Sequence, residues 1–182
     1  MKTYSITDTG ILREMNQDYF FASDEPVGNL PNLYIVADGM GGHKAGDYAS
    51  RYTTQRIVAS VSRSSGEEPV TILKEAITTA NRLLITEAAE DEAKKGMGTT
   101  LVAATIIDGR LYVANVGDSR LYLIGRDIQQ ITRDHSLVED MVRMGMIAKD
   151  EARTHYKKNV ITKAIGVAED KTATPDIFEI EI

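Results

Sequence analysis

Four short segments between residues 99 and 132 constrain the fold more than any other part of the sequence. They are rich in β-branched and apolar residues, and very short connections separate them: TTLVAATII (99–107), RLYVANVG (110–117), SRLYLIG (119–125) and DIQQIT (127–132). Closely spaced strands favour antiparallel pairing, and an Asp-Gly pair such as Asp108–Gly109 is typical of a tight hairpin turn. The sequence therefore predicts an antiparallel meander here.

Upstream of the meander, the pattern changes from strands to helices. Residues 2–7, 18–23 and 32–38 read as strands, and the last is so apolar that we expect it to be buried on both faces. Apolar residues then recur at helical spacing over 45–61 and, after Pro69, over 69–88. Two helices between two sets of strands predict an α+β layered domain.

The C-terminal third carries weaker signals. Ser136 and Glu139 form a capping box that predicts a helix start, and residues 149–165 look irregular. We interpret 136–166 as a surface flap subdomain within a single domain spanning residues 1–182. Phe178, Ile180 and Ile182 alternate with acidic residues, which predicts a final strand.

Composition excludes several classes of protein. At 182 residues and 42% hydrophobic content, the chain suits one globular domain, and it contains no cysteine, so a disulfide scaffold is impossible. The formal net charge of −6 argues against nucleic-acid binding. No signal peptide is evident, and no apolar run approaches the roughly 20 residues of a membrane helix, so we expect a cytoplasmic protein without a membrane partner.

The stretch VADGMGGHKAGDYAS (36–50) ends a predicted strand on Asp38 and then places four glycines before a helix. Glycines let a ligand approach the backbone, and Asp18 and Asp118 also lie at strand boundaries, so the three carboxylates could converge on a hard cation. Oxygen ligands without cysteine suit Mg²⁺ or Mn²⁺. The alternative interpretation is steric: glycines permit a tight strand-to-helix turn, and each aspartate is a turn former.

Six motifs in collinear order resemble the metal-dependent serine/threonine protein phosphatases of type 2C, in their compact bacterial form. They span nearly the whole chain: TDTGILREMNQD (7–18), VADGMGGHKAGDYAS (36–50), GMGTTLVAA (96–104), ANVGDSRLYLI (114–124), ITRDHSLVEDMVRMGMI (131–147) and KNVITKAIG (158–166). The resemblance implies two antiparallel sheets packed as a sandwich and flanked by helices (α-β-β-α), with a centre that binds two Mn²⁺ or Mg²⁺ ions.

The resemblance also implies roles for five residues. Asp38 corresponds to the carboxylate that bridges the metals, the carbonyl of Gly39 to a ligand of one of them, and Asp18 to an acidic residue that contacts the centre through water. Arg13 corresponds to the arginine that binds the substrate phosphate, and Asp118 to an aspartate associated with an additional metal. The alternatives are a surface charge for Arg13 and a plain β-turn for Asp118.

The implied reaction is hydrolysis of phosphoserine and phosphothreonine in proteins by a metal-activated water, without a covalent enzyme intermediate. The implied partners are phosphorylated proteins, including a serine/threonine kinase. The general acid is not identified. Met40 stands where many eukaryotic members have a histidine, so we interpret His43 as a loop or helix-start residue rather than a proton donor. We interpret His135 as a loop residue near the site, and we assign no function to His155.

Two later motifs of the family, each with a metal-binding aspartate, are missing, because Asp-Gly occurs only at 38–39 and 108–109 and Asp-Asn nowhere. We therefore expect an N-terminal portion of such a phosphatase, with weak or no activity. A phosphoprotein-binding regulatory fragment and an inert folded fragment are the alternatives. By resemblance, partners of the last strand, 176–182, include strands from the missing segment, so we expect exposed backbone groups and an exposed apolar sheet face. We therefore also expect self-association through this strand or its uncovered sheet, or fraying of residues 167–182.

Overall fold

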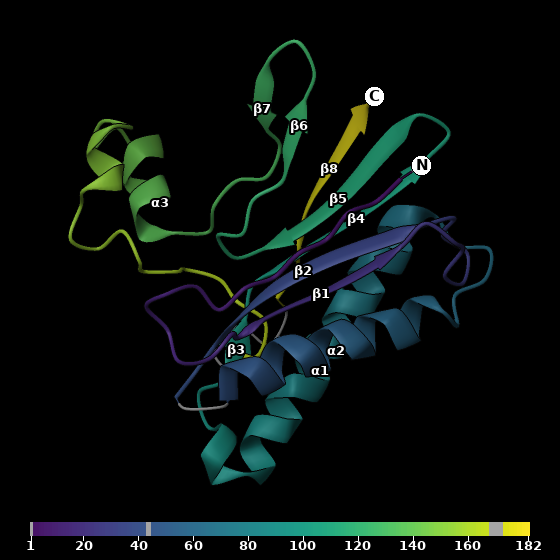
Figure 1. Ribbon diagram of the computed structural model, residues 1–182, viewed down its shortest axis with the longest axis horizontal. Helices are drawn as coiled ribbons and strands as arrows, with labels where there is room; N and C mark the ends of the chain where they lie inside the picture. Colours follow the sequence, from purple (N-terminus) through teal and green to yellow (C-terminus); the bar gives the residue numbers. More distant parts are fainter. Residues whose placement is uncertain (1, 43–44, 168–172) are drawn as a thin grey trace.

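The computed structural model describes residues 2–42, 45–167 and 173–182 (Figure 1). The elements are, in chain order, β1 (Asp18–Ser23), β2 (Leu33–Met40), α1 (Ala45–Val61), α2 (Pro69–Glu90), the 3-10 helix η1 (Glu92–Lys94), β3 (Gly98–Thr99), β4 (Leu101–Ile107), β5 (Arg110–Val116), β6 (Tyr122–Ile124), β7 (Ile128–Gln130), α3 (Leu137–Arg143), the 3-10 helix η2 (Glu151–Arg153) and β8 (Asp176–Glu181).

The main sheet is antiparallel with the strand order β1-β2-β4-β5-β8, and the short strand β3 pairs with the end of β2. A turn at Asp108 and Gly109, both with positive φ, connects β4 to β5 as the Asp-Gly pair predicts. Strands β6 and β7 form a separate two-stranded hairpin. The predicted meander is thus confirmed, although it divides between two sheets.

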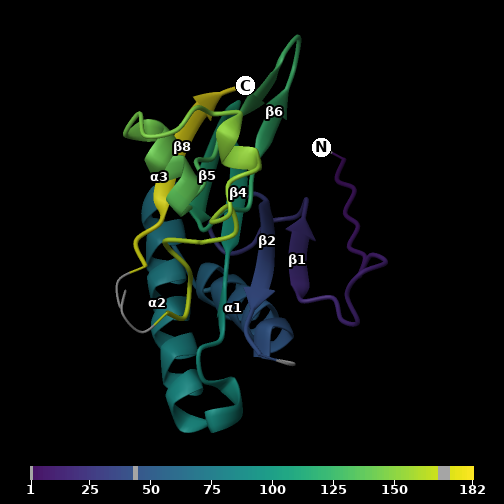
Figure 2. The ribbon, with the colours of Figure 1, turned by 90° about the vertical axis from the view of Figure 1, so that its left-hand side faces the viewer.

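Helices α1 and α2 pack on one another and cover one face of the main sheet (Figures 1 and 2). Alternate strand residues, among them Ile35, Leu101 and Ala114, join the helices in the larger hydrophobic core. The intervening residues face the other side, where Val113 and Phe178 meet Leu123 of the hairpin in a smaller cluster. Successive side chains of a strand point to opposite faces of the sheet, so alternate residues pack against the helices and the intervening ones against the hairpin.

The predicted α+β class with antiparallel sheets is confirmed. In the described residues, the second sheet consists of β6 and β7 alone, and α3 lies to one side of the main sheet rather than over it (Figure 1). Helix α2 is the longest element at 22 residues. No helix in the described part of the chain is both long enough and apolar enough to cross a membrane.

Two sequence-based expectations are wrong. Residues 2–7 form no strand: Tyr4 and Ile6 are exposed, and side chains rather than a backbone ladder hold this segment, with the Asn16 amide donating to Thr7 Oγ1 at 2.7 Å. Strand β2 is not buried on both faces, because Val36 is 53% exposed. The helices cover only one face of β2, and its apolar composition did not reveal this.

The segment 136–166 begins with α3, whose first turn is capped as predicted: the Ser136 hydroxyl accepts from the backbone N–H of Glu139 at 3.3 Å. Beyond α3, regular structure is limited to η2. An isolated bridge between Ser136 and Ile161 closes the segment at its base. Its interpretation as a flap subdomain stays a proposal.

Asn32 generates a test of the fold, because its side chain extends the pairing between β2 and β4. Its amide donates to Ile106 O and accepts from Ile106 N, both at 2.8 Å, and Asn32 is 7% exposed. Asn32→Ala should lower the free energy of unfolding by about 2–3 kcal/mol, because two backbone groups of Ile106 lose their partner. Urea denaturation followed by circular dichroism would measure this.

The matched control is Asn29→Ala, which removes one exposed bond from the Asn29 amide to Glu67 O. Its expected cost is under about 1 kcal/mol, because water replaces the lost partner. Equal losses in the two variants would show that Asn32 has no special role in joining β2 to β4.

Candidate functional site

Asp18 and Asp38 face one another across neighbouring strands. Asp18 is the first residue of β1, and the antiparallel register pairs it directly with Asp38 in β2. Side chains of cross-strand partners project from the same face of a sheet, so the two carboxylates lie close together. Both line a hollow of about 260 Å³ together with Arg13. The structure therefore brings together three of the residues predicted from the sequence.

The backbone of Asp38 is fixed by the two threonines of the GMGTT motif. The Thr100 N–H donates to Asp38 O at 2.9 Å, and Thr100 Oγ1 accepts from Asp38 N at 3.1 Å. Thr99 Oγ1 also donates to Asp38 O, at 3.0 Å. Both threonines are buried. Because the peptide groups of Asp38 are occupied, only its carboxylate is directed to the hollow. The motif itself does not reveal this role of the two threonines.

Gly39 is required by close packing. A Cβ at this position would lie 1.9 Å from Gly46 O, at the start of α1, and 2.7 Å from Gln17 O. The Gly39 N–H donates to that same Gln17 carbonyl at 3.0 Å. The steric interpretation of the glycine-rich stretch thus holds at Gly39, and the close approach of α1 to β2 sets the backbone that follows Asp38. The role of the Gly39 carbonyl as a metal ligand is a separate matter and stays a prediction.

The electrostatics of the carboxylate pair are unfavourable without a cation. The pKa of Asp38 is raised to about 6, chiefly by burial and next by the nearby charge of Asp18, with a weaker contribution from Asp118, while Arg13 opposes the rise. Two anionic groups that share a half-buried hollow favour either a proton or a metal ion. The donor set therefore fits a hard divalent cation such as Mg²⁺ or Mn²⁺. Within residues 2–42, 45–167 and 173–182, however, no three acidic, histidine or cysteine side chains converge on one point.

Asp118 lies next to this hollow but does not line it. It is half-buried in the turn between β5 and β6, and burial raises its pKa, with a smaller contribution from the charge of Asp134. It lines a second hollow, of about 650 Å³, between the hairpin and the segment that contains α3. The three aspartates therefore do not converge on one point: Asp18 and Asp38 form a close pair, and Asp118 reaches Asp38 only through its charge.

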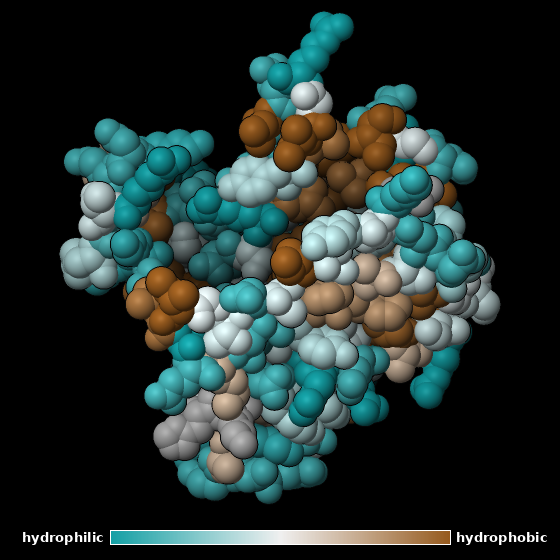
Figure 3. Space-filling model, viewed as in Figure 1, coloured by the Kyte–Doolittle hydropathy of each residue, from teal (hydrophilic) through white to brown (hydrophobic). Residues whose placement is uncertain are grey.

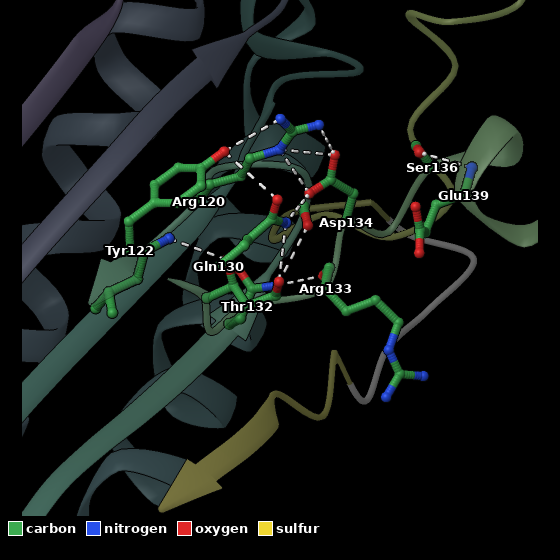
Figure 4. Close-up of polar contacts among 11 residues, drawn as sticks. Arg120, Tyr122, Gln130, Thr132, Arg133, Asp134, Ser136 and Glu139 are labelled. Carbon is green, nitrogen blue, oxygen red and sulfur yellow. Dashed lines mark hydrogen bonds and ion pairs between the residues drawn. The ribbon is translucent and has the colours of Figure 1, made fainter. Parts of the chain in front are cut away.

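A polar network fixes the strands that follow Asp118 (Figure 4). Arg120 binds both carboxylate oxygens of Asp134, with Nη2 to Oδ2 at 2.6 Å and Nε to Oδ1 at 2.9 Å, and its Nη1 contacts Tyr122 at 3.3 Å. Gln130 Nε2 donates to the same carboxylate at 3.1 Å. The Arg133 side chain points away from this network in the figure. A bidentate arginine pair is geometrically specific, so this network holds the base of the β6–β7 hairpin.

The three histidines differ in their surroundings. His43 lies outside the described residues. His155 is in the irregular part of segment 136–166 and contacts Tyr156. His135 was predicted to be a loop residue near the site, and it does lie in a loop, where its Nδ1 accepts from the Gly117 N–H at 2.9 Å. This contact was not predicted, because nothing in the sequence indicates that His135 and Gly117 meet.

The hollow opens into a larger groove. Arg13, Met15 and Gln17 line both the hollow and a groove of about 1100 Å³ that runs past Tyr48 to Lys94 and neighbouring residues. Arg13 is exposed at the boundary between them. The carboxylate pair is therefore accessible to a group carried on a larger molecule.

Comparisons with known proteins agree with this geometry. The family profile "Protein phosphatase 2C" matches residues 11–140. The serine/threonine phosphatase stp of Listeria innocua is 39% identical over 169 residues, which cover 88% of this chain and 65% of that protein. The crystal structure of the serine/threonine phosphatase Stp1 from Staphylococcus aureus matches with a TM-score of 0.88 and 39% identity, over 97% of this chain and 70% of that one.

A further crystal structure, the catalytic domain of the serine/threonine protein phosphatase PstP in complex with two manganese ions, matches with a TM-score of 0.77 and 29% identity, over 96% of this chain and 69% of that one. The chain thus spans somewhat less than two thirds of the Listeria relative. The profile covers more than half of the chain and includes Arg13, Asp18, Asp38 and Asp118. The chain belongs to the protein phosphatase 2C family.

Proposed function

We propose that this protein is a phosphatase that hydrolyses phosphoserine and phosphothreonine in other proteins with the help of Mn²⁺ or Mg²⁺. The observation that carries the proposal is the pair of cross-strand carboxylates, Asp18 and Asp38, in a hollow with Arg13 at its rim. A relative that is 39% identical to this chain is a serine/threonine phosphatase, and one structural neighbour was solved with two manganese ions. Cytoplasmic location and a kinase partner stay predictions.

In this proposal, Asp38, the Gly39 carbonyl and Asp18 would hold the cations, and Asp118 would help to hold an additional ion. The chemistry that such cations supply is activation of water as a nucleophile and neutralisation of phosphoryl charge. Arg13 binds two phosphoryl oxygens through its planar guanidinium fork and orients the substrate. The continuous groove beside Arg13 accommodates the polypeptide on either side of the phosphorylated residue.

A second function, phosphoprotein binding without turnover, is favoured by one observation. No group of three acidic, histidine or cysteine side chains converges in the described part of the chain, whereas the groove is present and Arg13, the residue proposed to bind phosphate, lines it. Turnover of a generic phosphoester with Mn²⁺ would establish the enzyme. Retention of a fluorescent phosphopeptide without turnover, and not of its unphosphorylated form, would establish the binding function instead.

The carboxylate pair predicts a trade-off between stability and metal binding. Because the folded-state pKa of Asp38 is raised, ionisation of Asp38 should cost the metal-free protein stability as pH rises from about 4 towards 7. Asp38→Asn removes the repulsion, so it should be more stable than the parent by about 1–2 kcal/mol at pH 7.5, and the advantage should vanish near pH 4. Thermal unfolding in a metal-chelating buffer would measure the difference.

Addition of Mn²⁺ should then raise the Tm of the parent but not that of Asp38→Asn, because a ligand stabilises only the state that binds it. Asp127→Asn, in the exposed β6–β7 turn, is the matched control and should behave like the parent. A parent that is already more stable than Asp38→Asn without metal at pH 7.5 would show that the pair is not repulsive.

The proposed role of Arg13 predicts a graded response. Arg13→Ala should raise KM for phosphopeptides, and it should also lower kcat if the contact strengthens in the transition state. Arg13→Lys should restore only part of the loss, since lysine cannot donate the bidentate fork. Steady-state kinetics, or phosphopeptide affinity if turnover is absent, would measure both variants. Unchanged values in both would mean that Arg13 is a surface charge.

Self-association through β8 is also part of the proposal. Strand β8 pairs with β5 over six residues, and in the described residues its other edge has no partner strand. Figure 3 shows hydrophobic side chains gathered on the upper part of the molecule. Exposed apolar residues of the β6–β7 hairpin include Ile124 and Ile128. An open edge beside apolar surface favours pairing with a second chain.

Glu179 and Glu181 are exposed on β8 and should limit this pairing. Replacing both with threonine should therefore move the monomer–dimer transition to lower concentration, as measured by light scattering over a dilution series. Replacing the exposed Glu68 and Glu75 with threonine is the matched control for charge. Monomers at every concentration in all variants, with slow amide exchange throughout β8, would refute the prediction.

A further inference from the structure

His135 joins segments that are far apart in the sequence. Its backbone N–H donates to Gly117 O at 3.0 Å, and its carbonyl accepts from the Thr162 N–H at 2.9 Å. Its ring accepts from the Gly117 N–H and lies beside Asp176, the first residue of β8. The His135 side chain is only 12% exposed. One residue thus contacts the turn after β5, the end of segment 136–166 and the start of β8.

The contact with Gly117 fixes the protonation of the imidazole ring. Gly117 N–H is a donor, so Nδ1 of His135 must be an unprotonated acceptor at 2.9 Å. A neutral ring then carries its proton on Nε2. That atom is buried, and Asp176 Oδ2 lies 3.2 Å from it, although the contact does not meet the geometry of a hydrogen bond. Asp176 is therefore the partner that favours the Nε2–H tautomer.

Asp176 is suited to this role. Burial alone would raise the pKa of Asp176, but the contacts with His135 and Lys163 outweigh it and hold the pKa below its usual value. Lys163 Nζ lies 3.5 Å from Oδ1, on the other oxygen of the carboxylate. The carboxylate is thus anionic at neutral pH and holds the ring between β8 and the turn at Gly117.

The turn at Gly117 is connected to Asp38 through Thr100. Gly117 has a φ of +105°, and a Cβ there would lie 2.7 Å from the side chain of Thr100. Thr100 Oγ1 lies 2.6 Å from Ser119 Oγ and also accepts from the Asp38 N–H. Asp118 lies between these two anchored residues. The position of its carboxylate relative to Asp38 therefore depends on the contacts that hold the turn.

We propose that His135 is a positioning residue that, together with Thr100, holds the Gly117–Ser119 turn and thereby fixes Asp118 relative to Asp38. In the neutral Nε2–H tautomer, which Asp176 favours, Nδ1 is an acceptor, and its hydrogen bond from the Gly117 N–H holds the turn. The consequence for metal binding rests on the proposed function, in which Asp38 and Asp118 are ligands. The consequence for the turn rests only on the contacts described above.

Two substitutions separate the two ring contacts. His135→Asn places an amide oxygen near the position of Nδ1, so it keeps an acceptor for Gly117 and loses the contact with Asp176. His135→Gln reaches the position of Nε2, so it keeps a donor for Asp176 and loses the acceptor. His155→Asn, in the same region of the chain but remote from Gly117 in its contacts, is the matched control.

Nuclear magnetic resonance on the whole chain provides readouts that do not need activity. In the parent, the imidazole ¹⁵N shifts should report the Nε2–H tautomer at neutral pH. In His135→Gln, the Gly117 amide should exchange about tenfold faster and the Asp118 amide should shift, whereas His135→Asn and His155→Asn should stay near the parent. An Nδ1–H tautomer in the parent, or unchanged Gly117 exchange in His135→Gln, would overturn the proposal.

Titration with Mn²⁺ alone then tests the consequence for the metal. Free Mn²⁺ measured by electron paramagnetic resonance should show several-fold weaker binding in His135→Gln than in His135→Asn, because a mobile Asp118 loses its alignment. Equal affinity in the two variants, with Gly117 exchange altered, would overturn the link from the turn to the metal.

If the parent binds no Mn²⁺ at all, the proposed function fails, and the tautomer and the amide exchange still decide the role of His135. If His135→Gln does not fold, the tautomer of the parent and the shifts in His135→Asn decide.

Discussion

The hydrogen bonds that tie Asp38 to Thr99 and Thr100 are the constraint on which the site depends. They join β2 to residues 99 and 100, between the short strand β3 and β4. They occupy the backbone N–H and carbonyl of Asp38 and leave its carboxylate free to bind a ligand. Buried backbone groups that lack partners are costly, so this arrangement cannot relax easily. A carboxylate on such a rigid base keeps its place even when it is repelled by Asp18.

The repulsion between Asp18 and Asp38 lies at the candidate metal site. Asp18 is placed opposite Asp38 by the register of β1 and β2, and this register is itself set by which face of each strand the helices cover. A slip of one residue would separate the carboxylates but would also turn the buried face of β1 away from α1. The hydrophobic core thus enforces a local electrostatic cost, which a divalent cation can offset.

Some parts of this structure follow from local sequence patterns, and others do not. The helices beginning at Ala45 and Pro69, the Asp108–Gly109 turn and the cap at Ser136 were predictable because each depends on residues within a few positions of one another. The loop at residues 2–7 was not, since an alternating segment becomes a strand only where a sheet edge accepts it.

The contacts of His135 and Thr100 could not be predicted from the sequence for a different reason. Thr100 meets Asp38 across 62 positions, and nothing in the sequence around either residue indicates the other. The resemblance to a family supplied candidate ligands, namely Arg13, Asp18, Asp38, Gly39 and Asp118, because motifs identify the residues that carry chemistry. It supplied none of the residues that hold those ligands in place, because their roles are defined only by distances in the folded chain.

Thr100 shows why the holding residues matter as much as the ligands. Its hydroxyl accepts from Asp38 N and contacts Ser119 Oγ, while its side chain fills the space that a Cβ on Gly117 would need. Any shift of the Gly117–Ser119 turn must therefore displace Thr100, and any shift of Thr100 must release the peptide of Asp38. The two segments that carry Asp38 and Asp118 are in this sense one rigid unit. A serine at position 100 would keep the hydroxyl but lose the methyl group against Gly117, so the bonds to Asp38 could survive while the turn gained freedom.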